Sequence, residues 1–163
     1  MHPVVEGEGA TQEQEGVTVE GLAARLVTLS SALSHLYLQA HLIHLNVEGP
    51  LFLSIHEFLK EQYDTHVGQF DKTAEFVRTL DVFMPMCEKG LLSSYKNFKH
   101  VKSYECRDML MVYLHNLEKI GMDAKDVGEY AKALKAPDVE NYMADLVGDM
   151  FKAAWFIKST LRT

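Results

Sequence analysis

Positive charge, cysteine and long apolar runs are all scarce in this sequence. Lys and Arg total 16 against 23 Asp and Glu, which leaves a formal net charge of −7. This balance argues against a surface built to bind nucleic acid and suits a protein that attracts cations. No run of about 18 apolar residues occurs, so we expect no membrane-spanning helix and no membrane partner.

The low cysteine content bears on the cellular compartment. Cys87 and Cys106 do not have the spacing of a metal-binding pair, and no basic segment followed by an apolar stretch opens the sequence. Two cysteines without a visible export signal are most simply reduced thiols in a cytosol. The sequence therefore predicts a cytoplasmic protein.

Residues 1–20 contain no Lys or Arg. They carry five glutamates together with Gly7, Gly9 and Gly16. This composition predicts a flexible acidic N-terminal tail over 1–20, followed by a single domain over 21–163. Because glutamates repel phosphate, DNA binding through this tail is not expected.

Sustained period-two alternation rich in Val, Ile and Thr is also absent, which argues against β-sheet. Apolar residues recur instead at spacings of three and four over 22–47, 52–80, 104–134 and 138–161. This spacing predicts four amphipathic helices. In the second helix the predicted inward positions are Phe52, Ile55, Leu59, Tyr63, Val67, Phe70, Ala74 and Val77.

The links between these helices indicate how they are connected. Gly49 and Pro50 end the first helix, and Asp138 can cap the last one. The link over 81–103 is too long for a tight hairpin and has room for one short helix near 93–99. Two short links and one long link match an all-α, ferritin-like four-helix bundle with one long crossover connection.

Two histidines and two carboxylates form the candidate site. His44 and His56 stand twelve residues apart across the Gly-Pro break, and Asp71 and Glu75 follow one helical turn apart. Imidazole and carboxylate are ligands of mixed N/O metal sites, including non-haem iron. His56 and Asp71 lie about 22 Å apart along one helix, at about 1.5 Å per residue. Either these groups are unrelated, or the site is built between two chains.

The chain resembles the Dps family, the small ferritins also called DNA-binding proteins from starved cells. The resemblance is carried by the run His44-Leu-Asn-Val-Glu-Gly-Pro-Leu-Phe-Leu-Ser-Ile-His56, followed by Asp71-Lys-Thr-Ala-Glu75. The family sets a second His twelve residues after the first and then the pattern D-x-x-x-E. The similarity is strongest over 22–80 and extends less specifically to Trp155-Phe-Ile-Lys.

The resemblance implies an assembly and an activity. Chains would pair at a two-fold axis and close into a hollow dodecamer. His44 and His56 of one chain, with Asp71 and Glu75 of its neighbour, would form a ferroxidase site. Fe²⁺ would bind there, an oxidant that is often peroxide would take its electrons, and Fe³⁺ would be stored as mineral inside the shell. The implied function is iron storage and detoxification.

Three carboxylates near the start of the last helix are candidates for an acidic pore at a three-fold axis. They are Asp138, Glu140 and Asp145. The alternative is that these side chains are simply favoured at a helix N-terminus by the macrodipole.

Lys60 is the departure from the family pattern with the largest consequence. The family places Asp or Glu four residues after the second His, where it ligates or bridges iron. A charged lysine offers no lone pair. The site could hold one ion and oxidise iron slowly, could favour a structural metal such as Zn²⁺, or could lose the metal to an ion pair from Lys60 to Asp71 or Glu75. Lys60 could also swing out, with Glu57, Glu61 or Asp64 taking part, although none is an obvious substitute. A Dps-like cage with a weakened or non-ferroxidase site is therefore the alternative function.

Three other positions bear on the site. Leu45 stands where the family usually has Trp, which removes an oxidisable ring and puts radical quenching in doubt. His41 lies one turn before His44 on the same face, so it either extends the site or is an interface or core residue. His66 is expected to be structural.

Overall fold

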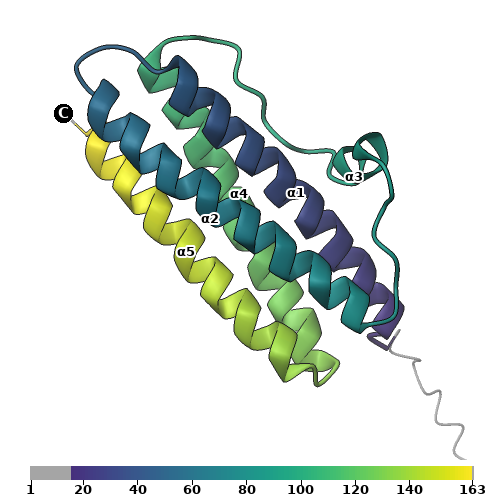
Figure 1. Cartoon of the computed structure of the whole chain (residues 1–163). Coiled ribbons are helices and arrows are strands. Elements are labelled where there is room, and N and C mark those ends of the chain that lie inside the picture. The colour runs from purple at the N-terminus through teal and green to yellow at the C-terminus, as the bar shows by residue number, and fades with distance from the viewer. Residues whose placement is uncertain (1–15, 163) are drawn as a thin grey trace, which may run out of the picture.

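The computed structural model describes residues 16–162, and every regular element over this range is a helix (Figure 1). The four long helices are α1 (Val19–Asn46), α2 (Phe52–Thr79), α4 (Cys106–Ala133) and α5 (Pro137–Leu161). A short helix, α3 (Glu88–Ser93), lies in the long connection from α2 to α4 and contacts α1. Helix α1 packs along α2, α4 packs along α5, and the two pairs meet mainly between α1 and α4. The predicted four-helix bundle with one long crossover is confirmed.

The predicted tail over 1–20 falls largely outside the described residues, because the description starts at residue 16. Helix α1 begins at Val19, two residues before the predicted domain boundary. The Thr18 side chain caps it by accepting a hydrogen bond of 2.9 Å from the Gly21 amide. The division into a tail and a domain stays a prediction.

The turns at the ends of the bundle follow the local sequence. Gly49, between α1 and α2, has a φ of 100°, which is costly for a residue that carries a Cβ. Before α5, Ala136 occupies the cap position and Pro137 is the first helical residue. The predicted cap at Asp138 is therefore wrong, since this residue already lies inside the first turn.

The predicted short helix near 93–99 is wrong in position, because α3 ends at Ser93. The Cys87 side chain caps α3 at its start by accepting a hydrogen bond from the amide three residues on. Beyond α3, side chains of the bundle bind the backbone of Lys99. The Lys99 N–H donates to the side-chain oxygen of Asn116 at 3.1 Å. The Lys99 carbonyl accepts from the side-chain amides of Asn116 at 2.8 Å and Gln39 at 3.0 Å. Because the N–H and C=O of Lys99 are already hydrogen-bonded to side chains, they are not available for the backbone hydrogen bonds of a helix.

The inward face of α2 differs from the predicted stripe at two positions. Phe52 and Val67 are 41% and 46% exposed. The side chains that α2 buries are Ile55, Leu59, His66, Gln69, Thr73 and Val77. Successive helical residues lie about 100° apart, so burying His66 turns Val67 toward solvent. None of the helices in the described range combines the length and apolar character needed to cross a bilayer.

A chain of buried polar side chains explains why His66 faces the core. Tyr113 donates its hydroxyl proton to His66 Nε2 at 2.7 Å, and His66 Nδ1 donates to Gln69 Oε1 at 2.8 Å. The Gln69 side-chain NH₂ then donates to Asp149 on α5 at 3.3 Å. Because this bond leaves Gln69 Oε1 to accept, it fixes which atom donates in each hydrogen bond of the network. Burial lowers the pKa of His66 to about 4, so the imidazole is neutral at pH 7. The expectation that His66 is structural agrees with this position.

This buried imidazole gives the stability of the fold a defined pH dependence. The unfolded chain takes up a proton on His66 near the ordinary pKa of 6.5, whereas the folded chain resists protonation until about pH 4. The free energy of unfolding should therefore fall by about 3 kcal/mol as pH drops from about 6.5 to about 4. Urea titrations at several pH values and one protein concentration measure this fall.

The matched variant is His66→Gln, which cannot titrate. It should be less stable than the wild type at pH 7, because it alters the hydrogen bonds to Tyr113 and Gln69. Its stability should change less between pH 6.5 and 4, because the contribution of His66 is gone. Equal pH profiles for the two proteins would contradict the assignment.

Candidate metal centre

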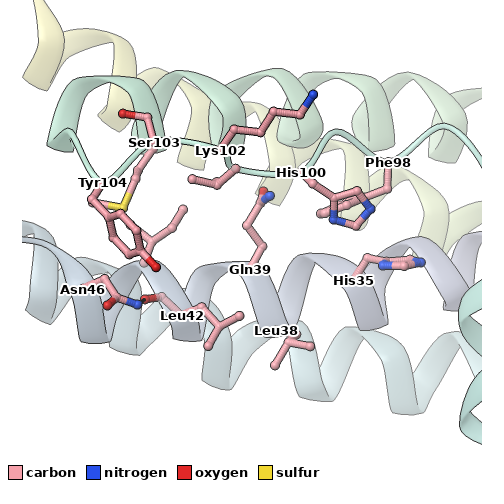
Figure 2. A pocket seen from close by; sticks show the side chains of 13 residues that line it. His35, Leu38, Gln39, Leu42, Asn46, Phe98, His100, Lys102, Ser103 and Tyr104 are labelled. Carbon is pink, nitrogen blue, oxygen red and sulfur yellow. Dashed lines mark hydrogen bonds between the residues drawn. The ribbon is translucent and has the colours of Figure 1, made fainter.

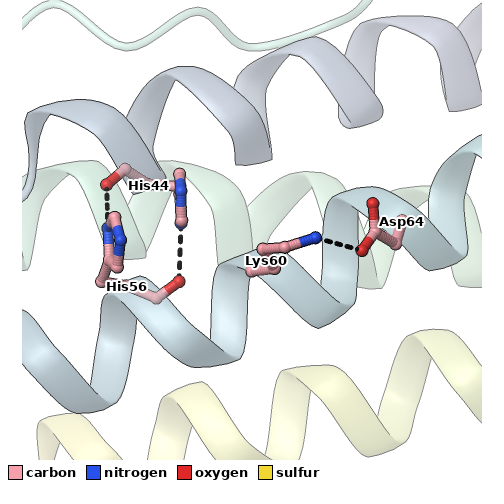
Figure 3. A network of polar contacts seen from close by, with 4 residues as sticks. All are labelled: His44, His56, Lys60 and Asp64. Carbon is pink, nitrogen blue, oxygen red and sulfur yellow. Dashed lines mark hydrogen bonds and ion pairs between the residues drawn. The ribbon is translucent and has the colours of Figure 1, made fainter.

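The turn between α1 and α2 brings His44 and His56 face to face. His44 lies in the last turn of α1, and His56 lies in the second turn of α2. Their ring centroids are 3.7 Å apart and their planes differ by only 13°. His44 is buried and His56 is half-buried. Figure 3 shows the two imidazoles stacked in the space between the helices.

Two reciprocal hydrogen bonds fix these rings. His44 Nδ1 lies 2.6 Å from the His56 carbonyl oxygen, and His56 Nδ1 lies 2.8 Å from the His44 carbonyl oxygen (Figure 3). Because a carbonyl oxygen only accepts, each Nδ1 must carry the proton and donate it. Each Nε2 is then left with a free lone pair. Metal-binding histidines in proteins are commonly oriented by such a bond from the other ring nitrogen.

The stacking limits what the two histidines can hold in this arrangement. An imidazole binds a metal ion along its lone pair, in the plane of the ring. Two stacked rings lie in separate, nearly parallel planes, so no point within bonding distance of both rings lies in both planes. The pair can serve two neighbouring ions, or one ion if one of the rings turns.

Further rings surround the histidine pair. Tyr63 stands edge-on to His44 at 5.2 Å between centroids and stacks on His41 at 4.1 Å. The His41 ring lies 6.0 Å from that of His44, and Tyr37 lies 6.4 Å from Tyr63. The sequence predictions left the two tyrosines out of the site. Their spacing would have revealed them, because Tyr63 follows His56 by seven residues and Tyr37 precedes His44 by seven, two helical turns in each case.

Lys60 does not reach the histidines but bonds along its own helix. Its ammonium donates to Asp64 at 2.7 Å, and both side chains are more than half exposed. Figure 3 shows the lysine pointing along α2 toward Asp64. The hydrogen bond to Asp64 raises the pKa of Lys60, so the position four residues after His56 is occupied by a charged ammonium at neutral pH. Exposed pairs of this kind contribute little to stability.

The two predicted acidic ligands lie far from the histidines of the same chain. Asp71 and Glu75 are exposed on α2 and make no hydrogen bond or ion pair with residues 16–162. Since α2 is one continuous helix, the separation of about 22 Å between His56 and Asp71 stands. Within the described part of the chain, no three His, Cys, Asp or Glu side chains gather closely enough to hold a metal ion.

The predicted pore carboxylates all lie on α5. Asp138 and Glu140 belong to its first turn, where the macrodipole favours negative charge. Asp145 is exposed two turns further along. Their place in the fold agrees with either explanation, so the pore stays a prediction.

A groove of about 430 Å³ lies between α1 and residues 98–104 of the crossover (Figure 2). Gln39 rises from α1 into its middle, but its amide already bonds the crossover and α4. His35 Nε2 donates to the Leu92 carbonyl at 2.8 Å. The Lys102 side chain points away from α1. The polar groups here fasten the crossover to the bundle and do not converge on a common point.

Comparisons with known proteins agree with this architecture. The sequence model of the ferritin-like domain matches residues 23–163. The fold is similar to Dps from Thermosynechococcus elongatus, with a TM-score of 0.84 and 22% identity over 88% of this chain and 92% of the other. It is also similar to Dps from Vibrio cholerae O1, with a TM-score of 0.82 and 21% identity over 88% and 91% of the two chains. That protein is described as a member of a broad superfamily of ferritin-like diiron-carboxylate proteins.

A further similar structure is CAIP from Helicobacter cinaedi, with a TM-score of 0.80 and 25% identity over 86% of this chain and 99% of the other. A search among curated protein sequences finds no match. The resemblance expected from the His44–Glu75 region is confirmed at the level of family and fold.

Proposed function

This chain belongs to the ferritin-like domain family, and we propose that it oxidises Fe²⁺ at sites between paired subunits and stores the ferric product in a hollow shell. Iron is the substrate and the stored cargo in this proposal. Peroxide is the expected oxidant, as the resemblance to Dps implies. The function is iron storage together with protection from iron-driven oxidation.

The observation that carries the proposal is the prearranged histidine pair. His44 and His56 each donate Nδ1–H to a backbone carbonyl, which leaves both Nε2 lone pairs free. The exposed carboxylates of Asp71 and Glu75 have no partner within the described chain. Imidazole nitrogen and carboxylate oxygen are a suitable donor set for Fe²⁺. The residues present therefore fit the metal, provided that the two halves come from different chains.

The surface around the site supports pairing. Leu38, Leu42 and Leu45 form a row on α1 and are 46%, 49% and 63% exposed. Leu53 and Val67 on α2 are also exposed, at 64% and 46%. An apolar surface of this kind is usually covered by another protein chain. We propose a two-fold pair of antiparallel α2 helices as the unit from which a twelve-subunit shell is built.

In such a pair the chain's own residues have separate tasks. His44 and His56 would bind Fe²⁺ through Nε2, either as two neighbouring ions with both rings held by their Nδ1–H bonds, or as one ion after one of the rings turns. Asp71 and Glu75 of the partner subunit would supply negative charge that favours the ferric state. Fe³⁺ would then hydrolyse, and the ferric hydroxide that forms would be stored as mineral inside the shell.

The test is to add Fe²⁺ and peroxide to the purified protein and measure the iron that stays soluble and elutes with it by size exclusion. We expect a soluble, iron-loaded particle much larger than one chain. The matched control is the double variant His44→Ala and His56→Ala, which should assemble but leave most of the iron as a precipitate. Precipitation with the wild-type protein, as in its absence, would contradict the proposal.

Lys60 favours a second candidate function, a Dps-like cage whose metal site is weakened or holds an ion such as Zn²⁺. The ammonium occupies the position where the family has a carboxylate, and in a pair it could instead bond Asp71 or Glu75 of the partner subunit. This candidate predicts a shell by light scattering, with no saturable Fe²⁺ binding and no effect of His44→Ala on iron.

Two further expectations belong with this proposal. The absence of DNA binding through the acidic tail concerns residues that lie largely outside the described range. The cytoplasmic location follows from the cysteine content and from the resemblance. Both stay predictions.

A further inference from the structure

Three sulfur atoms lie within four residues of the loop that leads from α2 to α3 (Figure 1). The sequence there is Met84-Pro85-Met86-Cys87. The whole chain has eight methionines and two cysteines, so this loop holds three of its ten sulfur atoms. Met86 is 96% exposed, Cys87 is exposed and Met84 is half-buried. Thioether and thiolate sulfur are soft donors, which select soft ions such as Cu(I).

The loop is held on both sides of the sulfur cluster. Before the cluster, Arg78 donates a hydrogen bond of 2.7 Å to the Val82 carbonyl, and its guanidinium lies 4.3 Å from the centre of the Phe83 ring. After it, the Cys87 sulfur accepts a hydrogen bond of 3.3 Å from the Gly90 amide. Because the segment between these contacts is short, the three sulfur atoms cannot move far apart.

The Cys87 sulfur lies on the same side of the chain as the residues before it. A Cβ placed on Gly90 would be 3.3 Å from this sulfur and 3.6 Å from the Cβ of Pro85, so the sulfur and Pro85 are close to each other. Met84 and Met86 flank Pro85, and a methionine side chain has three rotatable bonds. Both thioethers can therefore reach an ion held by Cys87. Glycine at position 90 leaves the Cys87 sulfur uncrowded.

This cluster is separate from the histidine pair of the same chain. His56 lies near the start of α2, and the loop begins after the helix ends at Thr79. At about 1.5 Å per residue, these two points are about 35 Å apart along the axis of α2. The two places also differ in chemistry, since one presents imidazole nitrogen and the other presents sulfur.

We propose that Met84, Met86 and the Cys87 thiolate form a three-sulfur site for Cu(I). Binding replaces the thiol proton of Cys87 by copper, so a Cu–S bond forms, one proton is released and no electron is transferred. Cu(I) accepts few ligands, so three donors from one short segment supply a complete set. Fe²⁺ prefers nitrogen and oxygen donors, and the site therefore takes an ion that the histidine pair and the carboxylates do not favour. This inference does not depend on the proposed function.

The experiment titrates the full-length protein with Cu(I), without oxygen, against the coloured Cu(I) chelator bicinchoninate. The wild type should withdraw about one Cu(I) per chain from the chelator, and X-ray absorption at the copper edge should show sulfur ligands. Cys87→Ser should lose this withdrawal. The double variant Met84→Leu and Met86→Leu should bind Cu(I) about tenfold more weakly, because leucine keeps the size and apolar character but lacks the sulfur.

The chain offers matched controls for both kinds of donor. Cys106→Ser removes the other thiol, which is half-buried at the start of α4. Met122→Leu removes a thioether that is 48% exposed on the same helix. Both variants should bind Cu(I) as the wild type does. The double variant His44→Ala and His56→Ala should also keep this binding, so a failure of the iron proposal leaves the copper site standing.

Four results would overturn the inference. The first is a wild type that withdraws no Cu(I). The second is unchanged binding in the double methionine variant, which would show that the thioethers are not ligands. The third is half an equivalent of Cu(I) per chain that depends on Cys87 alone, which would show that thiols of two chains share the ion. The fourth is nitrogen or oxygen in place of sulfur in the X-ray absorption spectrum.

Discussion

Replacing Lys60 by aspartate is expected to raise the number of Fe²⁺ ions bound per chain from about one to about two. Position 60 follows His56 by one helical turn, so a carboxylate there lies on the same face and adds an oxygen ligand beside the His56 Nε2. The change also removes a repulsion. That repulsion acts between the Lys60 ammonium and the bound cation, and solvent screening weakens it because the lysine is exposed. Anaerobic Fe²⁺ titration followed by calorimetry measures both the number of ions and their affinity.

Two variants separate the ligand from the charge. Lys60→Ala removes the ammonium and adds no ligand, so it should tighten the first ion and create no second site. Lys60→Arg keeps the charge and should behave as the wild type does. A side effect is expected in Lys60→Asp, because it faces Asp64 one turn away and like charges at this spacing destabilise a helix by a few tenths of a kcal/mol. An unchanged ion count in Lys60→Asp would contradict the assigned role of this position.

Mixing two defective chains is expected to restore part of the iron binding. One variant lacks the imidazoles through His44→Ala and His56→Ala, and the other lacks the charges through Asp71→Asn and Glu75→Gln. Each alone should bind no Fe²⁺ saturably, since every site then lacks half of its ligands. A mixed pair contains one site with all four native residues and one site with none. Random mixing should therefore restore about one quarter of the wild-type sites.

The restoration follows from the length of α2. A continuous helix over Phe52–Thr79 holds His56 and Asp71 about 22 Å apart in one chain, so native ligands can meet only across a pair. The matched control mixes the imidazole-deficient chain with a chain that carries all four substitutions, and it should restore nothing. If the two complementary variants also restored no Fe²⁺ binding, the ligands would not be shared between chains. Co-expression with two different affinity tags isolates the mixed assemblies.

The sequence predicted the features that depend on periodicity. The spacing of apolar residues gave four helices, and Gly49 explains the turn that brings His44 and His56 together. The continuity of α2, which separates His56 from Asp71, was also visible as an unbroken pattern. These features depend on local rules that act within a few residues of each other.

The features that depend on tertiary contacts were missed. The stacking of His44 on His56 depends on how closely two helix ends approach, and the periodicity of either helix contains no such information. The short crossover helix was misplaced because the backbone of Lys99 is bound by Asn116, a residue 17 positions away. The hydrogen bond from Lys60 to Asp64 lies within one helix. It was missed because the choice of partner for Lys60 also depends on groups of a second chain, whose positions one sequence does not specify.

The central claim is that one metal site is shared between two chains, and a crystal structure of the assembled protein soaked with Fe²⁺ without oxygen tests it most directly. Anomalous scattering locates the iron independently of the protein atoms. We predict iron bonded to Nε2 of His44 or His56 of one chain and to Asp71 or Glu75 of the partner subunit, with Lys60 outside its ligand set. Iron held by residues of a single chain, or no iron at the histidine pair, would contradict the account.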